Sequence, residues 1–249
     1  MAITDAYSGF LSFPVGNQTF GGDARATVTA VEAGASLREV TILVIGIIGS
    51  GKIGSTVARL AVGAGHDVVI SNSRGPDSLS DLVASLGPHA RAATVAQAVR
   101  DGDIVVIAIP FRSRATLFGS GVDFRGKIVV DAMNAYTENF EPMDLGGKGS
   151  SELVAQELPG ARVVKAFNTL YSKTLASAAQ PKGSPERIVL PLASDDADAK
   201  RVVASFIDSI GYQPFDNGSL VGGRRQQPET ALYNKSLSAS QAATLVANG

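Results

Sequence analysis

Some residue types are absent or scarce in this sequence, and each absence excludes a kind of chemistry. There is no cysteine among the 249 residues, which excludes disulfide bonds, thiolate nucleophiles and zinc–cysteine sites. Histidine occurs only as His66 and His89, so we expect no metal centre built from several imidazoles. The sequence therefore predicts a protein without a metal site.

A large excess of charge and long apolar runs are also absent. The net charge is −1 and the pI is near 6.1, so we expect no nucleic-acid partner. The most apolar run, residues 41–48, is far shorter than the roughly 20 residues that span a bilayer. The opening residues MAITDAYSGF lack the basic and apolar regions of a signal peptide. These features predict a soluble, cytoplasmic protein with no membrane partner.

From Val40 onward, apolar runs typical of buried strands alternate with segments of helical periodicity. Hydrophobic residues make up 45% of the chain, enough for a sizeable core. The alternation predicts an α/β fold with a doubly wound, mostly parallel sheet and a small C-terminal α/β extension. The expected strands are residues 41–47, 67–71, 90–93, 103–110, 126–134, 161–168, 187–194 and 212–216. The expected helices are residues 52–64, one from Pro76 to Gly87, one capped by Thr94 and Gln97, and residues 195–210.

Three segments do not fit this alternation. Residues 1–39 are rich in small residues, which is compatible with a flexible arm, with extra strands, or with a translation start near Val40. Residues 134–151, which contain GGKGSS, and the tail after Asp216 are expected to be long and flexible.

The stretch GIIGSGKIGST, residues 46–56, is compatible with two phosphate-binding loops. Gly46 and the pair Gly51-Lys52 have the spacing of a P-loop. A P-loop needs Ser or Thr directly after the lysine, because that hydroxyl ligates magnesium. The residue here is Ile53, which cannot do so.

The second loop is G-x-G-x-x-G, formed by Gly49, Gly51 and Gly54 between an expected strand and an expected helix. In this pattern the first glycine permits the tight turn and the second lets the backbone approach a pyrophosphate. The third permits close packing of helix on strand, and the pyrophosphate lies on the helix N-terminus. The context predicts a Rossmann-type dinucleotide-binding domain.

The residues after the second strand indicate which dinucleotide is bound. An NAD site usually has an acidic residue there to accept from the ribose 2′-hydroxyl. This chain instead has Asn72, Ser73 and Arg74. A carboxylate would repel a 2′-phosphate, whereas an arginine pairs with it, so the sequence predicts NADP rather than NAD.

Five stretches together resemble the coenzyme F420-dependent NADP oxidoreductases, over roughly residues 41–235. The resemblance implies an enzyme that moves a hydride between NADPH and a deazaflavin, with coenzyme F420 as second substrate and a homodimer as the expected assembly. It implies an NADP-binding domain (40–186) and a small substrate-side part with a tail (187–249), whereas residues 1–39 lie outside the resemblance and are expected to form an N-terminal extension. The stretches are GIIGSGKIGSTVARLAVGAGHDVVISNSRGP, AIPFRS, VDAMNAY, VVKAFNTLYS and PLASDDADAKRVVASFIDSIGYQPFDNGSL.

We expect the site at the carboxyl ends of the strands, where open α/β sheets bind ligands. Hydride transfer between flat rings depends on alignment, so no catalytic acid or base is required. The candidates for cofactor binding are Gly49, Ser50, Gly51, Lys52, Ile53, Gly54, Asn72, Ser73, Arg74, Ile109, Pro110, Phe111, Ala132 and Asn134. The candidates for substrate binding are Met133, Ala166, Phe167 and Asn168.

Asn134, Lys165 and Asn168 are the candidates for a direct polar role in the reaction. The two asparagines have the groups to orient the carboxamide or the deazaflavin carbonyls. Lys165 and Asn168 are compatible with a polar pair beside the substrate, or with a structural lysine and a turn-capping asparagine.

Several other residues have weaker alternatives. Both histidines precede strands, and we interpret them as surface or turn residues. Tyr136 and Tyr171 are interpreted as packing residues. Arg112, Arg114, Arg224 and Arg225 are compatible with phosphates of an anionic partner coenzyme or with a solvated surface.

Two other functions remain open. One keeps NADPH but reduces another small acceptor, such as an imine, a ketone, a flavin or a ferric complex. The other is a non-enzymatic NADP sensor.

Overall fold

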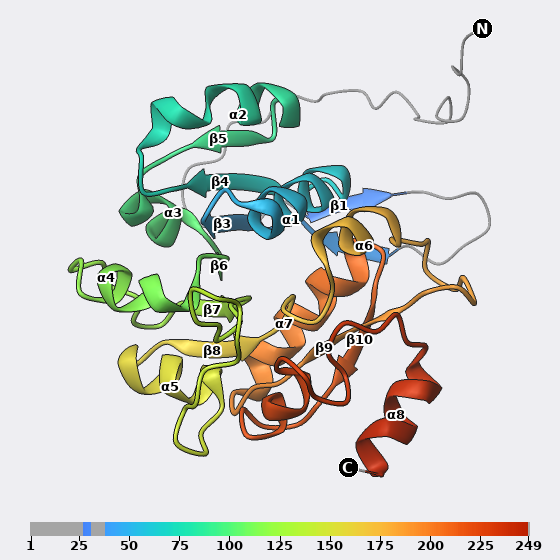
Figure 1. The fold of residues 1–249 in the computed structure, drawn as a ribbon. Coiled ribbons are helices and arrows are strands. Elements are labelled where there is room, and N and C mark those ends of the chain that lie inside the picture. The colour runs from blue at the N-terminus through green and yellow to red at the C-terminus, as the bar shows by residue number, and fades with distance from the viewer. Residues whose placement is uncertain (1–26, 31–37, 249) are drawn as a thin grey trace, which may run out of the picture. The chain divides into compact units, whose positions relative to one another are not determined.

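The computed structural model describes residues 27–30 and 38–248, in two units that comprise residues 1–42 and 43–249 (Figure 1). In the first unit, β1 (Thr27–Ala30) and β2 (Arg38–Thr41) form an antiparallel pair. This segment therefore contributes extra strands, one of the three alternatives for residues 1–39; the other residues of that extension lie outside the described ranges.

The second unit is built on a six-stranded sheet in the order β5-β4-β3-β6-β7-β8, in which every neighbouring pair is parallel. This confirms the predicted doubly wound α/β fold. The strand alternation in the sequence arises because each strand is connected to the next through a helical segment. The strands are β3 (Val44–Ile48), β4 (Asp67–Ser71), β5 (Ala90–Ala92), β6 (Ile104–Ile107), β7 (Ile128–Asp131) and β8 (Arg162–Lys165).

Helices cover both faces of this sheet (Figure 1). Alternate residues of β6 show the division. Ile104 and Val106 belong to one buried cluster with residues of the helices at 52–63, 172–177 and 197–209, whereas Val105 and Ile107 belong to another with residues of the helices at 95–101, 114–118 and 150–157. All four of these side chains are 0% exposed, and burying each contributes about 1.5–3 kcal/mol. The helical elements are α1 (Lys52–Gly63), η1 (Pro76–Leu79), α2 (Ser80–Leu86), α3 (Val95–Asp101), η2 (Phe111–Ser113), α4 (Arg114–Phe118), α5 (Ser150–Glu157), α6 (Ser172–Ser177), α7 (Ala197–Ser209), η3 (Gly222–Gln226) and α8 (Ala239–Ala247).

The last two expected strands form a separate parallel pair, β9 (Val189–Leu192) and β10 (Gln213–Asp216). They do not extend the main sheet. The chain after β9 meets β8 at one antiparallel bridge, between Lys165 and Ala193. One residue further on, Ser194 Oγ donates to the Val163 carbonyl at 2.6 Å, so a side chain replaces a ladder hydrogen bond.

The tail after Asp216 was predicted to be flexible, and this is wrong. It contains η3 and α8 and folds back, and Val189 N of β9 donates to the Leu237 carbonyl at 2.9 Å. Leu232 and Ala242 are buried with Val189 in a small apolar cluster. The scattered apolar residues of this tail lack a clear period, which is why the sequence did not reveal their packing.

Smaller differences concern helix starts. The helix expected from Pro76 opens with a 3-10 turn, and α7 starts at Ala197 with Asp196 as its N-cap. The predicted capping box of Thr94 and Gln97 is confirmed. Among the described residues, we find no helix with both the length and the apolarity needed to cross a membrane.

Candidate functional site at the carboxyl edge of the sheet

The strands of the main sheet end at one level, which we call the carboxyl edge. The register aligns Ile48 of β3 with Ser71 of β4 and with Ile107 of β6. It then aligns Ile107 with Asp131 of β7, and Asp131 with Lys165 of β8. The segments that leave these strands therefore begin side by side. The switch point lies between β3 and β6, where the chain changes direction across the sheet.

The glycine loop after β3 uses its three glycines in two ways. A Cβ at Gly49 would lie 2.4 Å from the Ala108 carbonyl oxygen, and Gly49 has φ +108°. A Cβ at Gly54 would lie 1.9 Å from the Gly49 carbonyl oxygen. A Cβ at Gly51 would meet no protein atom within 4 Å. The first and third glycines are thus required by the fold, whereas the space beside Gly51 is open to a ligand.

The N-terminus of α1 begins at this open position. Gly51 is the N-cap; it provides no side-chain cap, and the first turn of α1 contains no acidic residue. The first intrahelical acceptor is the Gly51 carbonyl, which receives Ser55 N at 2.9 Å. The amides before Ser55 and the positive end of the helix dipole therefore suit an anionic ligand, and Lys52 is exposed beside them. This geometry fits the diphosphate of a dinucleotide.

The segment after β4 lies against the glycine loop. Asn72 Nδ2 donates to Ser50 Oγ at 3.2 Å and to Ser78 Oγ at 2.9 Å. Asn72 Oδ1 in turn accepts from Arg74 N at 2.9 Å. Ser73 and Arg74 are exposed, and within the described part of the chain the Arg74 guanidinium forms no ion pair. Asn72 thus fixes the loop from which Arg74 projects.

The segment after β6 offers mainly its backbone. Ile109 is half-buried and Pro110 is exposed, but the Phe111 side chain is only 1% exposed. The Arg114 guanidinium lies over the Phe111 ring, 4.0 Å from its centroid, and pairs with Glu157 at 3.0 Å. A cofactor contact at Phe111 would therefore involve its main chain.

A buried polar cluster, which consists of Asp131, Ser150, Ser151 and Lys165, joins β7, β8 and the start of α5. Lys165 is 1% exposed, and its Nζ lies 3.2 Å from Asp131 Oδ2. The ammonium also donates to Ser150 Oγ at 3.1 Å and to the Met133 carbonyl at 2.5 Å. Ser151 Oγ donates to Asp131 Oδ2 at 2.6 Å, and Asp131 Oδ1 accepts from Met133 N at 2.9 Å.

All three N–H bonds of Lys165 therefore have acceptors inside the protein. Burial lowers the pKa of Lys165, and this effect exceeds the opposing effect of the Asp131 carboxylate. With no solvent-facing surface and no uncommitted proton, Lys165 is placed to hold the β7 and β8 segments together. The contacts favour its structural alternative over a catalytic one.

Asn134 and Asn168 contact each other across the same two segments. Asn134 Nδ2 donates to the Asn168 carbonyl at 2.9 Å, and Asn168 Nδ2 donates to Asn134 Oδ1 at 3.0 Å. Asn168 Nδ2 also donates to the Gln226 carbonyl at 2.6 Å, and Gln226 Nε2 donates back to Asn168 Oδ1 at 3.2 Å. The Asn168 side chain thus links the segment after β8 to the segment after β7 and to η3.

The substrate-side candidates Met133, Ala166 and Phe167, and the neighbouring cofactor candidate Ala132, present little side-chain surface. Ala132, Met133 and Phe167 are 6%, 1% and 1% exposed, and Ala166 is fully buried. Phe167 is a non-glycine residue with φ +64°, and it packs 5.9 Å from the Phe206 ring. A left-handed conformation costs about 1–2 kcal/mol, and strain of this kind concentrates at functional sites. Contacts with a substrate here would be made largely through main-chain atoms.

Sequence reasoning missed four residues that organise this side of the edge: Asp131, Ser150, Ser151 and Gln226, which is 0% exposed. A signal was present for one of them. Asp131 and Lys165 are opposite charges at the ends of two apolar strands, which only pairing makes tolerable. Gln226 lies 61 residues from Lys165, whose carbonyl it contacts at 3.3 Å, and no local pattern connects them.

His66 was interpreted as a surface or turn residue, and the surface part of that interpretation is wrong. It is 2% exposed; Nδ1 accepts from Leu43 N at 3.2 Å and Nε2 lies 2.8 Å from Ser209 Oγ. Its ring packs edge-on against Phe206, with centroids 5.5 Å apart. Burial lowers the pKa of His66 against the opposing effect of Asp67. His89 is exposed and pairs with Asp67 at 2.9 Å.

The candidate arginines differ in how far they are committed to other groups. Arg224 forms a two-pronged pair with Glu152 at 2.6 and 2.8 Å, and Arg225 Nε donates to Asn217 Oδ1 at 3.2 Å. Arg112 is loosely placed, 3.9 Å from Glu138. Of these, Arg112 is the least engaged and so the most available to an anionic ligand.

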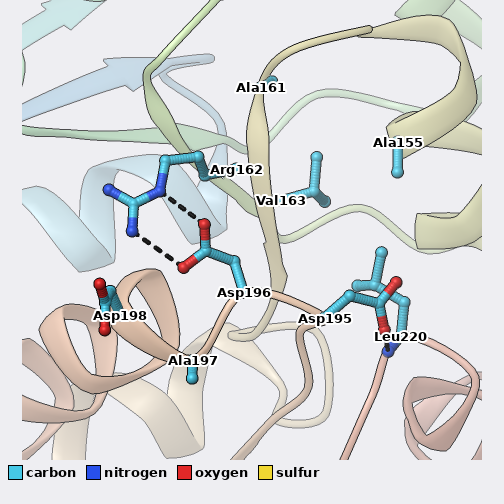
Figure 2. Close-up of a pocket in the computed structure, with 9 residues that line it drawn as sticks. All are labelled: Ala155, Ala161, Arg162, Val163, Asp195, Asp196, Ala197, Asp198 and Leu220. Atoms are coloured by element: carbon cyan, nitrogen blue, oxygen red, sulfur yellow. Dashed lines mark hydrogen bonds and ion pairs between the residues drawn. The ribbon is translucent and has the colours of Figure 1, made fainter.

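A cavity of about 510 Å³ lies elsewhere, against the start of β8 and the N-terminus of α7 (Figure 2). Arg162 pairs with Asp196 there at 2.7 Å, and Asp195 and Asp198 add further carboxylates. None of the candidate cofactor residues lines it. Its acidic lining would repel a diphosphate, so we assign the cofactor site to the carboxyl edge instead.

A family model described as NADP oxidoreductase, coenzyme F420-dependent, matches residues 44–135. This match covers every candidate cofactor-binding residue from Gly49 to Asn134. It ends before the substrate-side candidates Ala166, Phe167 and Asn168.

Solved structures extend the similarity over most of the chain. The hypothetical protein SMa0349 from Sinorhizobium meliloti is 40% identical, with a TM-score of 0.72 and 79% of this chain and 95% of that chain covered. A proposed F420-dependent NADP reductase from Arthrobacter sp. FB24 is 25% identical, with a TM-score of 0.64 and 78% and 98% covered. An imine reductase from Pseudomonas sp., at 19% identity and a TM-score of 0.54, shares the fold over 72% of this chain and 56% of its own.

Among curated proteins, the metalloreductase STEAP3 of Rattus norvegicus is 29% identical over 180 residues. That alignment covers 72% of this chain but 35% of the rat protein, so the chain spans about a third of the length of this relative.

Proposed function

The chain belongs to the coenzyme F420-dependent NADP oxidoreductase family, and we propose that it transfers a hydride between NADPH and the deazaflavin coenzyme F420. The family makes it an NADP-dependent oxidoreductase. One observation carries the cofactor part of the proposal. The glycine loop leaves space only beside Gly51, at the uncapped N-terminus of α1, where a diphosphate can contact main-chain amides.

The residues around this loop fit the rest of NADPH. The diphosphate would lie on the amides at the start of α1, with Lys52 beside it. The adenosine 2′-phosphate would pair with Arg74, which Asn72 holds in place through its hydrogen bond to Arg74 N. Bound NADPH supplies the hydride, and the protein supplies position and electrostatics.

The β7 and β8 segments would form the wall on which the two rings align. The buried polar cluster and the Asn134–Asn168 contacts fix residues 132–134 and 166–168 against each other. Rigid walls matter here because hydride transfer depends on the distance and alignment of two carbons. A fixed main-chain surface suits a flat heterocycle better than a cluster of mobile charged groups.

Coenzyme F420 is favoured as the partner by the description of the family and by the Arthrobacter relative, which matches 98% of its chain to this one. The test is direct. Purified protein is mixed with NADPH and oxidised F420, and the visible absorbance of the deazaflavin is followed. We expect it to disappear at a rate proportional to protein concentration. The Gly51→Val variant is the matched control and should be inactive. Wild-type protein that binds NADPH but leaves F420 oxidised would refute the acceptor.

Reduction of a ferric complex is the second candidate, favoured by the similarity to the rat metalloreductase. The same assay separates the two when ferric citrate, with and without added flavin, replaces F420. Turnover with iron and none with F420 would favour this candidate. Turnover with neither, despite NADPH binding, would favour an NADP sensor.

A further inference from the structure

Two tyrosine hydroxyls meet beside the substrate-side wall. Tyr136 follows β7 and Tyr233 belongs to the C-terminal segment, and their oxygens lie 3.1 Å apart. Both residues are half-buried. Their positions in sequence are 97 residues apart, so this contact exists only in the folded chain.

Main-chain hydrogen bonds hold both tyrosines at the carboxyl edge. Tyr136 N donates to the Asn134 carbonyl at 3.0 Å, which places the ring directly after the Asn134–Asn168 contact. On the other side, Asn234 N donates to the Thr169 carbonyl at 2.7 Å, one residue after Asn168. The hydroxyl pair is thus tied to the segments that leave β7 and β8.

One of the two hydroxyl protons of this pair has no acceptor among the described residues. Tyr136 donates to the oxygen of Tyr233, and within residues 38–248 the Tyr233 hydroxyl donates to no protein acceptor. Burial raises the pKa of Tyr233. The Tyr233 hydroxyl therefore keeps its proton near pH 7 and is able to donate it in a hydrogen bond.

Several other polar groups on this side are already engaged. The Lys165 ammonium has three acceptors, and the amides of Asn134 and Asn168 bind each other and η3. His66 lies in the turn before β4, at the opposite end of the strands. Among the described residues, the tyrosine pair keeps one hydroxyl proton that no protein group accepts, beside the segments that leave β7 and β8.

We propose that the Tyr136–Tyr233 hydroxyl pair is the acceptor subsite, in which Tyr233 donates to a carbonyl oxygen or ring nitrogen of a flat heterocyclic acceptor and supplies its proton. As the redox-active ring atom of the acceptor (a carbon in a deazaflavin, a nitrogen in a flavin) takes the hydride, a conjugated π electron pair moves to the carbonyl oxygen or to another ring nitrogen. Tyr233 releases its hydroxyl proton to that atom and takes the Tyr136 proton, and water reprotonates Tyr136. The hydride and one solvent proton together account for the reduced acceptor. This inference rests on the proposed function and adds the chemistry by which its acceptor is recognised.

The experiment measures acceptor binding to protein free of NADPH, so that it does not depend on turnover. Wild type, Tyr233→Phe and Tyr136→Phe are titrated with oxidised F420 and, separately, with FMN, by fluorescence. Tyr212→Phe is the matched control, because Tyr212 also loses one phenol hydrogen bond, to the Leu175 carbonyl, in the core. We expect Tyr233→Phe to weaken binding about tenfold and Tyr136→Phe about threefold, as loss of one hydrogen bond predicts. Tyr212→Phe should lower the melting temperature without changing either affinity.

The two acceptors separate failure of the subsite from failure of the proposed function. Wild type that binds FMN but not F420 overturns F420 as the acceptor, and the FMN affinities of the variants then test the hydroxyl pair. Affinities of Tyr233→Phe and Tyr136→Phe within about twofold of wild type, for the acceptor that binds, overturn the subsite. Binding of neither acceptor to wild type overturns both proposals. In turnover with NADPH, Tyr233→Phe should also reduce kcat at saturating acceptor, and an unchanged kcat would overturn proton supply by Tyr233.

Discussion

The carboxyl edge has two halves that differ in what they leave open to a ligand. The glycine-loop half, around β3 and β4, offers main-chain amides at Gly51 and an exposed Arg74. The polar-cluster half, around β7 and β8, buries its charges, and each proton of Lys165 is used inside the protein. The glycine-loop half is suited to binding the negative charges of a ligand, and the polar-cluster half is suited to holding a fixed conformation.

This contrast indicates that the two halves have different roles, one in binding the cofactor and one in aligning the two rings. An anionic cofactor can be bound by amides and by the helix dipole without any buried side-chain charge. Aligning two rings requires a wall that does not move, and a paired, hydrogen-bonded cluster provides it at the cost of strict dependence on each partner. Substitutions in the glycine-loop half should therefore affect mainly cofactor binding, and those in the polar-cluster half should affect mainly stability.

The largest loss of stability is expected from Lys165→Met. This change leaves the Asp131 carboxylate buried without its cation, which costs about 3–5 kcal/mol. The free energy of unfolding is measured by urea denaturation. The double variant Asp131→Asn/Lys165→Met removes both charges while it keeps an acceptor for Met133 N. It should therefore be more stable than Lys165→Met alone.

An exposed ion pair provides the control for the Lys165 experiment. Asp123 and Arg125 are both solvent-exposed and lie 2.7 Å apart, and Arg125→Met should change stability little. If the loss of unfolding free energy in Asp131→Asn/Lys165→Met equals the sum of the losses in the two single variants, the unpaired buried charge is not the cause of the instability.

The glycine loop should separate stability from binding. Gly54→Ala forces a Cβ against the Gly49 carbonyl and should destabilise by about 1–3 kcal/mol. The Cβ of Gly51→Val would meet no protein atom within 4 Å, so this change should alter stability by less than about 1 kcal/mol. We nevertheless expect Gly51→Val to abolish NADPH binding, because its side chain fills the space beside the amides. Calorimetric titration and thermal melts test both variants. A Gly51→Val protein that still binds NADPH would show that the diphosphate lies elsewhere.

The same two halves show how far the sequence alone can predict this protein. The six strands of the main sheet follow from local apolar runs, and β4 was predicted at its observed bounds, Asp67–Ser71. The glycine motif is also local, since its meaning depends on a strand before it and a helix after it. These features are contained in short windows of sequence.

The polar-cluster half depends on strand order, which short windows do not contain. Asp131 and Lys165 are 34 residues apart and meet only because β7 and β8 are neighbours in register. Gln226 and Tyr233 reach the same region through a C-terminal tail whose apolar residues have no clear period. The sequence predicted strands β7 and β8 of this half, but neither α5 nor the folded tail, nor the contacts that hold them.

A smaller and more selective effect is expected at Arg74. Arg74→Ala should weaken NADPH binding about tenfold or more, since charged hydrogen bonds contribute about 1.5–3 kcal/mol. NADH, which lacks the 2′-phosphate, should bind the variant within about twofold of wild type. Arg112→Ala, an exposed arginine after β6, is the matched control and should not alter the preference. Equal losses of affinity for NADPH and NADH in Arg74→Ala would refute the assignment of Arg74 to the 2′-phosphate.

The smallest effect concerns His66, far from both halves. Its Nδ1 accepts from Leu43 N, so the folded protein needs the neutral ring, and its pKa is lowered from 6.5 by burial. The unfolded state then binds the extra proton more readily than the folded state. The contribution of His66 to the free energy of unfolding is therefore complete above about pH 6.5 and decreases as the pH falls through the folded-state pKa. Thermal melts between about pH 7.5 and pH 5 should show a flatter decline for His66→Gln than for wild type. If the His66→Gln variant shows the same slope as wild type, the acid sensitivity belongs to other groups.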